Sequence, residues 1–344
     1  MKAYCYLGKD KFGFVEKTEP HIADPRDAVV RVTLSSICTS DLHIMYGLVP
    51  RARTGVTVGH EFVGVVEETG ADVKSVKAGD RVAVNVETFC GECFFCRRGW
   101  VNNCTSPLGG WALGCRIDGA QAAYVRVPFA DNGLTKIPDG VSDERALLVG
   151  DVLATGYWAA DIADIGADDT ALVVGGGPVG LCAAMCAALR AKRVVVCEAD
   201  AGRREFAKRH YPQFTAISPE HAEEFCRGEC AHGGADAVIE AAGTDASFAL
   251  GWKCARPNAT VVVAAMYDAP QVLPLPDMYG KNLVFKTGGV DGCKCAEELA
   301  LIAEGKIDPA PLITHTFAFS DIEKAYELFA SRADGVMKVA LRSE

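Results

Sequence analysis

Short apolar segments separated by glycine and proline fill the first half of the chain. Four of them have the β-branched content or the alternation of strands, and they cover residues 28–34, 64–68, 81–86 and 122–127. Beyond about residue 150, apolar strands alternate with helical segments instead. Strands are predicted at 171–174, 194–197, 237–240, 261–265 and 283–285, with helices at 179–190 and 201–210. This alternation predicts a parallel, doubly wound sheet that follows a mostly β region.

The last fifty residues predict two amphipathic helices, at 296–305 and from Asp321 onward, and a final strand at 336–341. Ser320 and Glu323 have the spacing of a capping box at the start of the second helix. Residues 171–189 lack charge, but glycines and a proline interrupt them, so a strand and a helix are predicted rather than a membrane span.

Composition narrows the function classes. The length of 344 residues suggests about two domains, and 35 Lys and Arg against 45 Asp and Glu give a net charge of −10. This balance excludes a nucleic-acid partner, because no basic run is present to displace counterions. The N-terminus lacks the apolar run of a signal peptide. We therefore expect a cytoplasmic protein without a membrane partner, whose 15 cysteines are thiols and metal ligands.

A glycine turn stands between the strand at 171–174 and the helix that follows. Gly175, Gly177 and Gly180 fit the G-x-G-x-x-G pattern, with Pro178 and Val179 between the last two glycines. The glycines permit a tight turn, close approach of a pyrophosphate and close packing of the helix, whose N-terminus attracts negative charge. The sequence therefore predicts a dinucleotide site here.

An acid at the end of the next strand selects the cofactor. Glu198 stands about 20 residues after the glycine turn, where a carboxylate accepts hydrogen bonds from ribose hydroxyls and repels a 2′-phosphate. Arg203 and Arg204 lie nearby and are able to bind such a phosphate, but Asp200 adds negative charge. We expect NAD rather than NADP, with Arg203 among the cofactor-binding residues.

Four cysteines form the strongest local signal. Cys90, Cys93, Cys96 and Cys104 have the spacing C-x2-C-x2-C-x7-C, which suits a closed tetrahedral zinc site. A ferredoxin-type iron–sulfur motif would have three residues before its last cysteine and a proline after it, whereas Thr105 follows here. The sequence predicts a structural zinc site.

Two further fragments complete a pattern, namely Cys38-Thr-Ser-Asp-Leu-His43 and Gly59-His60-Glu61. Together with the cysteine cluster and the glycine turn, they resemble the zinc-dependent medium-chain alcohol dehydrogenases over nearly the whole chain. The resemblance implies a GroES-like catalytic domain at 1–152 with a zinc lobe at about 88–106. It further implies a Rossmann NAD-binding domain at 153–290 and a return to the catalytic domain at 291–344.

The resemblance also implies roles for individual residues. Cys38, His60 and Asp151 match the ligands of a catalytic zinc, and this would be the second zinc ion of each chain. Glu61 matches an acid behind the metal, and Asp41 matches the carboxylate that orients the ligand histidine. Ser40 and His43 match a proton relay, in which a histidine that titrates near neutral pH suits the outer end. Thr155 matches a contact to the nicotinamide.

Four details resemble the tetrameric bacterial secondary-alcohol dehydrogenases, namely Thr39-Ser40-Asp41, the aspartate ligand, Gly110-Trp111 and Met266-Tyr267. Those enzymes favour NADP, however, and many lack the four-cysteine zinc. An apolar substrate pocket is expected from Val86, Trp111, Tyr267 and Val290, in which Val86 leaves room for a second substituent on the carbinol carbon. The leading hypothesis is reversible hydride transfer between NAD and a secondary alcohol or ketone. A homotetramer or homodimer is expected, with residues 270–279 as a candidate contact.

Three alternatives stay open. A polyol dehydrogenase of the sorbitol type, or an amino-alcohol dehydrogenase of the threonine type, would need polar pocket side chains, which Asp291 and Arg116 could supply. A steroid or terpenoid alcohol would suit the apolar pocket. A non-catalytic zinc- and nucleotide-binding relative would have no use for a proton relay.

Overall fold

Two compact units make up the chain in the computed structural model, which describes residues 1–343. Met1–Ala154 and the C-terminal segment from Asp291 form the first unit, and Thr155–Val290 form the second. Among the described residues, no helix has the length and apolar character needed to cross a membrane.

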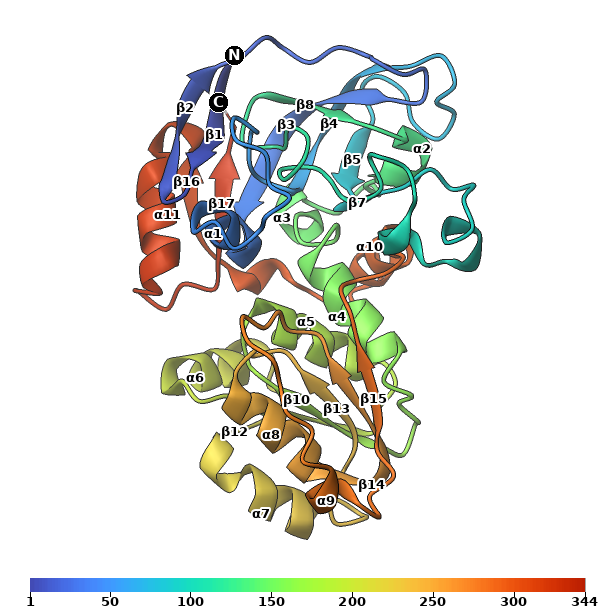
Figure 1. Cartoon of the computed structure of the whole chain (residues 1–344), viewed down its shortest axis with the longest axis vertical. Helices are drawn as coiled ribbons and strands as arrows, with labels where there is room; N and C mark the ends of the chain where they lie inside the picture. Colours follow the sequence, from blue (N-terminus) through green and yellow to red (C-terminus); the bar gives the residue numbers. More distant parts are fainter. Residues whose placement is uncertain (344) are drawn as a thin grey trace. The chain divides into compact units, whose positions relative to one another are not determined.

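The second unit is a six-stranded parallel sheet with helices beside it (Figure 1). Its strands are β10 (Thr170–Val174), β11 (Arg193–Cys197), β12 (Thr215–Ile217), β13 (Ala235–Glu240), β14 (Ala255–Val263) and β15 (Val284–Thr287). Its helices are α4 (Val152–Asp161, which begins in the first unit), α5 (Pro178–Ala187), α6 (Ala201–His210), α7 (Pro219–Glu229), α8 (Asp245–Cys254) and α9 (Leu275–Met278).

The strand order is β12-β11-β10-β13-β14-β15. Successive strands are therefore added on one side of β10 as far as β12 and on its other side from β13 onward. Ligands of doubly wound sheets bind where the order changes sides in this way, outside the carboxyl ends of the strands. Every residue of β10 is buried, and so are residues 180–187 of α5, which explains why this stretch carries no charge. The predicted strand and helix are confirmed, and the doubly wound fold class is confirmed with them.

The first unit is built on antiparallel strands (Figure 1). A seven-stranded sheet holds β3 (Ala28–Ile37), β4 (Glu61–Thr69), β5 (Arg81–Val84), β8 (Tyr124–Val127), β9 (Leu134–Lys136), β16 (Ile313–Ala318) and β17 (Lys338–Arg342). Two antiparallel pairs accompany it, β1 (Lys2–Gly8) with β2 (Lys11–Glu16), and β6 (Glu87–Thr88) with β7 (Gly110–Trp111). Only β16 and β17 pair in parallel within the large sheet.

Short helices complete the first unit. They are α1 (Thr39–Met45), α2 (Ala130–Gly133), α3 (Asp143–Ala146), α10 (Cys295–Ala303) and α11 (Ile322–Ser331). The predicted capping box of α11 is wrong. A 3-10 turn at Phe319–Asp321 precedes the helix, and Asp321 takes the capping position without a side-chain cap. The Asp321 carboxylate binds Lys324 Nζ at 2.6 Å instead.

Candidate active site

The first element of the site is the short helix α1, which begins directly after Cys38. The backbone N–H of Cys38 donates to Asp41 Oδ2 at 2.9 Å, so the carboxylate three residues on fixes the start of the helix. The Cys38 side chain contacts both the first turn of this helix and the segment before α4. Its Sγ lies 3.6 Å from Ser40 Oγ and 3.8 Å from Asp151 Oδ2.

His60 and Glu61 come from the start of β4, and Asp151 stands just before α4. His60 Nε2 lies 3.1 Å from Asp151 Oδ2. One ligand atom from each of Cys38, His60, Glu61 and Asp151 lies within 4.8 Å of the others. Segments far apart in the sequence thus bring a thiol, an imidazole and two carboxylates to one point inside the first unit.

Asp41 lies behind the imidazole. Its Oδ1 is 3.5 Å from His60 Nδ1. Both atoms are buried, and neither forms a hydrogen bond with the described residues. The carboxylate is placed to orient the ring and to favour the tautomer with the proton on Nδ1. His60 Nε2 is then the nitrogen that faces Cys38 and Asp151.

A buried ion pair between Lys338 and Glu61 lies beside the cluster. Lys338 Nζ, from β17, lies 2.5 Å from Glu61 Oε2 and donates to the carbonyl of Ile37 at 2.9 Å. Ser36 Oγ donates to the same Glu61 oxygen. The other oxygen, Oε1, is buried without a partner. Because Lys338 and Glu61 are both fully buried, each charge depends on the other for compensation.

The electrostatics of the cluster suit a cation. Burial lowers the pKa of His60, but its interactions with Asp151, Asp41 and Cys38 outweigh this effect, so the pKa lies well above its ordinary value. Burial, assisted by the charge of Glu61, raises the pKa of the Cys38 thiol. A divalent cation at this point would displace both protons, since imidazole and thiolate bind metals in their deprotonated forms.

The two residues predicted as a relay lie on α1. Ser40 and His43 are three positions apart, which puts them on the same face of the helix, and both are partly exposed. Ser40 Oγ is the nearer of the two to the cluster, through its contact with Cys38 Sγ.

Two of the four predicted pocket residues lie beside the cluster. The Trp111 ring meets the His60 ring edge-on, with centroids 5.3 Å apart. The backbone N–H of Val86 donates to the carbonyl of Gly150 at 3.0 Å, directly before Asp151. The other two, Tyr267 and Val290, belong to the second unit. There the Tyr267 hydroxyl donates to Glu240 Oε2 at 2.6 Å.

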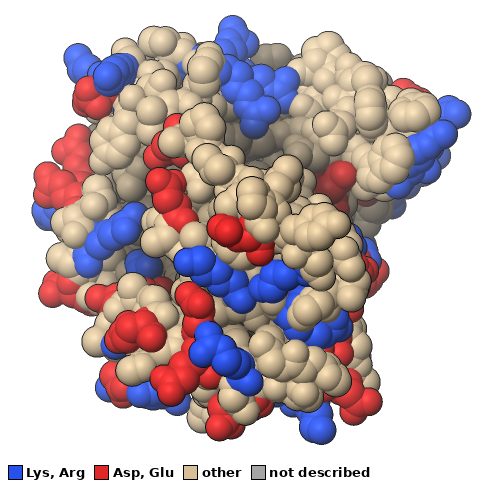
Figure 2. Space-filling view, turned by 60° about the horizontal axis from the view of Figure 1, so that its bottom comes forward, with Lys and Arg blue, Asp and Glu red and all other residues tan. Residues whose placement is uncertain are grey.

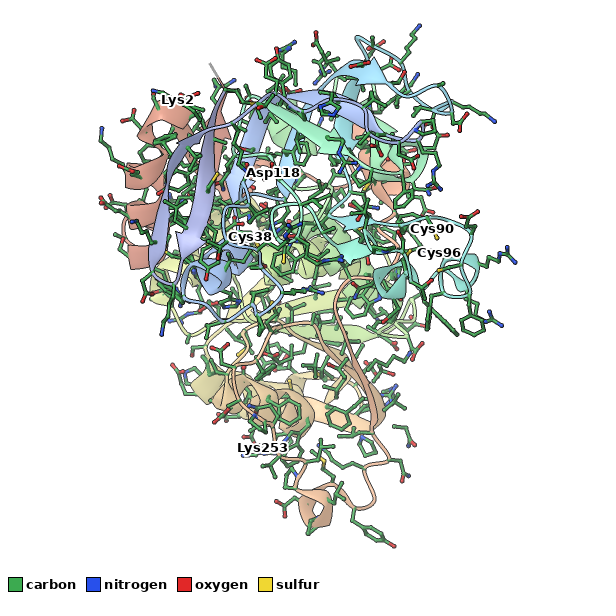
Figure 3. All side chains as sticks on the ribbon, turned by 45° about the horizontal axis from the view of Figure 1, so that its top comes forward. Lys2, Cys38, Cys90, Cys96, Asp118 and Lys253 are labelled. Atoms are coloured by element: carbon green, nitrogen blue, oxygen red, sulfur yellow. The ribbon has the colours of Figure 1, made fainter. Side chains whose placement is uncertain are left out.

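The four-cysteine segment folds around its own sulfur atoms (Figure 3). Cys93 Sγ lies 3.4 Å from Cys96 Sγ, Cys104 Sγ lies 3.6 Å from Cys90 Sγ, and Cys90 and Cys96 are 4.0 Å apart. Backbone N–H groups point at the sulfurs, and those of Cys96 and Thr105 lower the pKa of Cys93 to about 5. A set of thiols converging on one point, with donors that stabilise thiolates, fits a tetrahedral zinc ion.

The glycine turn has the geometry that the motif predicts. Gly175 has a φ of +107°, and a Cβ on Gly180 would overlap the Gly175 carbonyl oxygen. Gly177 caps α5, and Pro178 is the first residue of that helix, followed by Val179. The turn thus presents a helix N-terminus at the carboxyl end of β10.

Glu198 faces this turn from the end of β11. It is buried, and it accepts hydrogen bonds from the backbone N–H groups of Gly176 at 2.6 Å and Asp200 at 2.8 Å. Arg203 Nη1 lies 3.6 Å from the position that a Cβ on Gly177 would take. Arg204 instead donates to the carbonyls of Glu198 and Ala199, both at 2.7 Å. Thr155 lies partly buried on α4.

Comparisons with known proteins agree with this arrangement. A family model for the alcohol dehydrogenase GroES-like domain matches residues 24–139, and one for zinc-binding dehydrogenases matches residues 178–299. An alcohol dehydrogenase of Cupriavidus necator is 32% identical over 370 residues, covering 99% of this chain and 98% of that protein. The NADP-dependent isopropanol dehydrogenase of Thermoanaerobacter brockii is 31% identical, with 98% of each chain covered.

Among solved structures, the alcohol dehydrogenase TADH from Thermus sp. ATN1 matches with a TM-score of 0.91 and 32% identity over all of both chains. The fold and the matches define an oxidoreductase that acts on CH–OH groups of small-molecule alcohols. The chain belongs to the zinc-type alcohol dehydrogenases of the medium-chain dehydrogenase/reductase superfamily. Zinc and a nicotinamide dinucleotide are the cofactors of this family.

Sequence reasoning missed two basic residues near the site. Lys338 gave no signal, because a single lysine in a terminal strand is usually solvated. Arg51 lies with its guanidinium carbon 5.2 Å from the centroid of the Trp111 ring. A basic residue in a loop has no distinguishing pattern, so only the folded chain reveals this contact.

Proposed function

We propose that this enzyme transfers hydride reversibly between NAD and a secondary alcohol or ketone, with two zinc ions per chain. The observation that carries the proposal is the convergence of Cys38, His60 and Asp151 at one buried point. Three protein ligands of this kind leave a coordination position for substrate, whereas the four-cysteine set leaves none. The first set therefore suits a catalytic zinc, and the second a structural one.

The residues around the catalytic set have distinct tasks. A zinc ion bound there would supply Lewis acidity that lowers the pKa of an alcohol. Asp41 holds the His60 ring in the orientation that its role as a ligand requires. Glu61, paired with Lys338, places a second carboxyl group beside the ligands. Ser40 accepts the alcohol proton as its own hydroxyl proton moves on toward His43, which lies farther along the same helix face and passes the proton to solvent.

The pocket wall favours an apolar carbinol. Val86 and Trp111 offer carbon surface next to the ligand set. The groups that a polyol would require are already engaged. Asp291 accepts the N–H of Asn102 at 2.9 Å, and Arg116 donates to the carbonyl of Pro107 at 2.7 Å.

The direct test is a steady-state assay. Zinc-loaded enzyme is incubated with NAD and a panel of primary, secondary and polyhydric alcohols, and NADH is followed by its absorbance. We expect the highest kcat/KM with secondary alcohols. A preference for polyhydric alcohols would replace the proposal by the polyol alternative, and absence of any turnover would refute both.

We predict that Glu198→Ala weakens NAD binding about tenfold and reduces the preference for NAD over NADP. NAD binds more weakly because the ribose hydroxyls lose a charged hydrogen-bond acceptor. NADP is discriminated against less because the carboxylate no longer repels a 2′-phosphate. Kd values for both cofactors, measured by fluorescence titration, check this. Glu224→Ala removes an exposed acid from α7 and serves as the control. A parent enzyme that prefers NADP would contradict the prediction.

We also propose a homo-oligomer, and we predict a dimer or tetramer by sedimentation at micromolar concentration. The supporting observation is a run of exposed apolar side chains around residues 270–279, in which Val272 is 76%, Leu275 66% and Tyr279 93% exposed. The adjacent strand β15 forms an edge of the sheet, and bare edges favour association. A species of only 36.5 kDa would refute the proposal.

A further inference from the structure

A cation lies close to the candidate active site without an acidic partner. Trp111 meets the His60 ring at 5.3 Å, and the Arg51 guanidinium stacks over the same indole at 5.2 Å. The guanidinium is therefore no more than about 10.5 Å from the imidazole. The indole orients the guanidinium through a cation–π contact, and Arg51 also hydrogen-bonds the Cys115 thiol, which acts to lower the pKa of that thiol.

Two further arginines reinforce this charge. The backbone N–H of Arg53 donates to the carbonyl of Cys115 at 2.9 Å, and Arg53 Nη1 approaches the carbonyl of Arg116 at 3.4 Å. These contacts join the loop of Arg51 and Arg53 to the turn that carries Arg116. The charges of Arg51, Arg116 and His60 all act to lower the pKa of the Cys115 thiol. Burial has the larger, opposite effect, so this pKa is raised overall.

No carboxylate lies within ion-pair distance of these three arginines among residues 1–343. Burial, together with the charge of Arg51, lowers the pKa of Arg116, so the cluster disfavours its own positive charge. Asp118, close by in the sequence, is already paired with Lys17 at 2.5 Å. Elsewhere acidic and basic side chains are interspersed, as over much of the face in Figure 2.

A surface cavity of about 370 Å³ extends the basic region. Arg53 and Arg116 line it together with Lys17 and Arg126, and Asp118 is the single acid among its lining residues. On a chain with a net charge of −10, this is a local reversal of sign. Such a region attracts anions to this part of the surface.

We infer that the substrate is an alcohol that also carries an oxyanion, a carboxylate or a phosphate, which Arg51 binds. The inference rests on the proposed function, because it places the reacting hydroxyl at Cys38, His60 and Asp151. Val86 and Trp111 then contact the carbon chain between the two ends. A guanidinium fork matches the paired oxygens of either oxyanion, so Arg51 is a specificity-determining residue.

Three substrates that share the segment CH3–CHOH–CH2–CH2 and differ in the group after it test this. They are 2-pentanol, 4-hydroxypentanoate and 3-hydroxybutyl phosphate, assayed with NAD and zinc-loaded enzyme. We expect the parent to prefer one of the two anions. Arg51→Gln should lower the ratio of kcat/KM for the preferred anion to kcat/KM for 2-pentanol by tenfold or more. Lys74→Gln, which removes an equal charge from the loop after β4, should leave the ratio unchanged. A parent that prefers 2-pentanol, or an unchanged ratio in Arg51→Gln, would overturn the inference.

A second measurement separates this inference from the proposed function. Glutarate carries a carboxylate at each end and no hydroxyl group, so its binding to Arg51, measured by titration calorimetry on zinc-free enzyme, requires neither zinc nor turnover. We expect Arg51→Gln to bind glutarate at least tenfold more weakly than the parent. Equal binding by both proteins would overturn the inference even if alcohols are oxidised. If no alcohol is oxidised but glutarate binding depends on Arg51, the anion site stands and the proposed reaction fails.

Discussion

Replacement of Cys38 by serine is expected to reduce turnover at least a thousandfold while the protein stays folded. A thiolate is a strong zinc ligand, whereas a serine hydroxyl stays protonated near neutral pH and binds zinc poorly. The remaining ligands, His60 and Asp151, would then hold the ion too weakly. We expect metal analysis to show one zinc per chain fewer than in the parent.

The control for this variant is Cys5→Ser. Cys5 is fully buried and its Sγ lies 3.7 Å from the carbonyl of Ala3 and 3.8 Å from Thr57 Oγ1, contacts that a hydroxyl can replace. We expect this variant to keep both zinc ions and full activity. Circular dichroism should show both variants folded. Parent-like activity and zinc content in Cys38→Ser would remove Cys38 from the ligand set.

The parts of the site that could be predicted from the sequence are those with local spacing. The glycine turn requires Gly175 and Gly180 because side chains there would strain or overlap the backbone, so the chemistry appears directly in the sequence. The four cysteines are also local, since a lobe of about fifteen residues brings their sulfurs together. The doubly wound sheet was predictable because strands buried on both faces are continuous apolar runs.

The parts that could not be predicted depend on tertiary contacts between polar residues. Lys338 donates to Ile37, 301 residues away in the sequence, and it pairs with Glu61 only because β17 lies beside β3. Neither residue shows a partner in its own segment. The capping box of α11 failed for a different, local reason, since Asp321 binds Lys324 and the chain forms a 3-10 turn before the helix. Local spacing cannot report which of two competing local contacts is made.

The four-cysteine lobe has little apolar surface of its own to hold it together. Phe94 and Trp100 are about half exposed, and Val101 is the only buried apolar side chain among residues 90–104. Its attachments to the rest of the unit are few hydrogen bonds, such as that from Asn132 Nδ2 to the Phe89 carbonyl at 2.9 Å. Cohesion must therefore come from the metal, whose binding energy is folding energy in a lobe of this kind.

On this basis we predict that Cys104→Ser loses one zinc ion per chain together with stability. Three cysteines bind zinc much more weakly than four, and the lobe opens when the ion leaves. A loss of about 3 kcal/mol would lower the midpoint of thermal unfolding by roughly 6–12 °C in a unit of this size. Differential scanning calorimetry and metal analysis measure both effects, with Cys5→Ser again as the control. Cys93→Ser should behave in the same way as Cys104→Ser, because both sulfurs belong to one tetrahedron. If either variant retains two zinc ions and the parent's midpoint, the four cysteines do not form a structural zinc site.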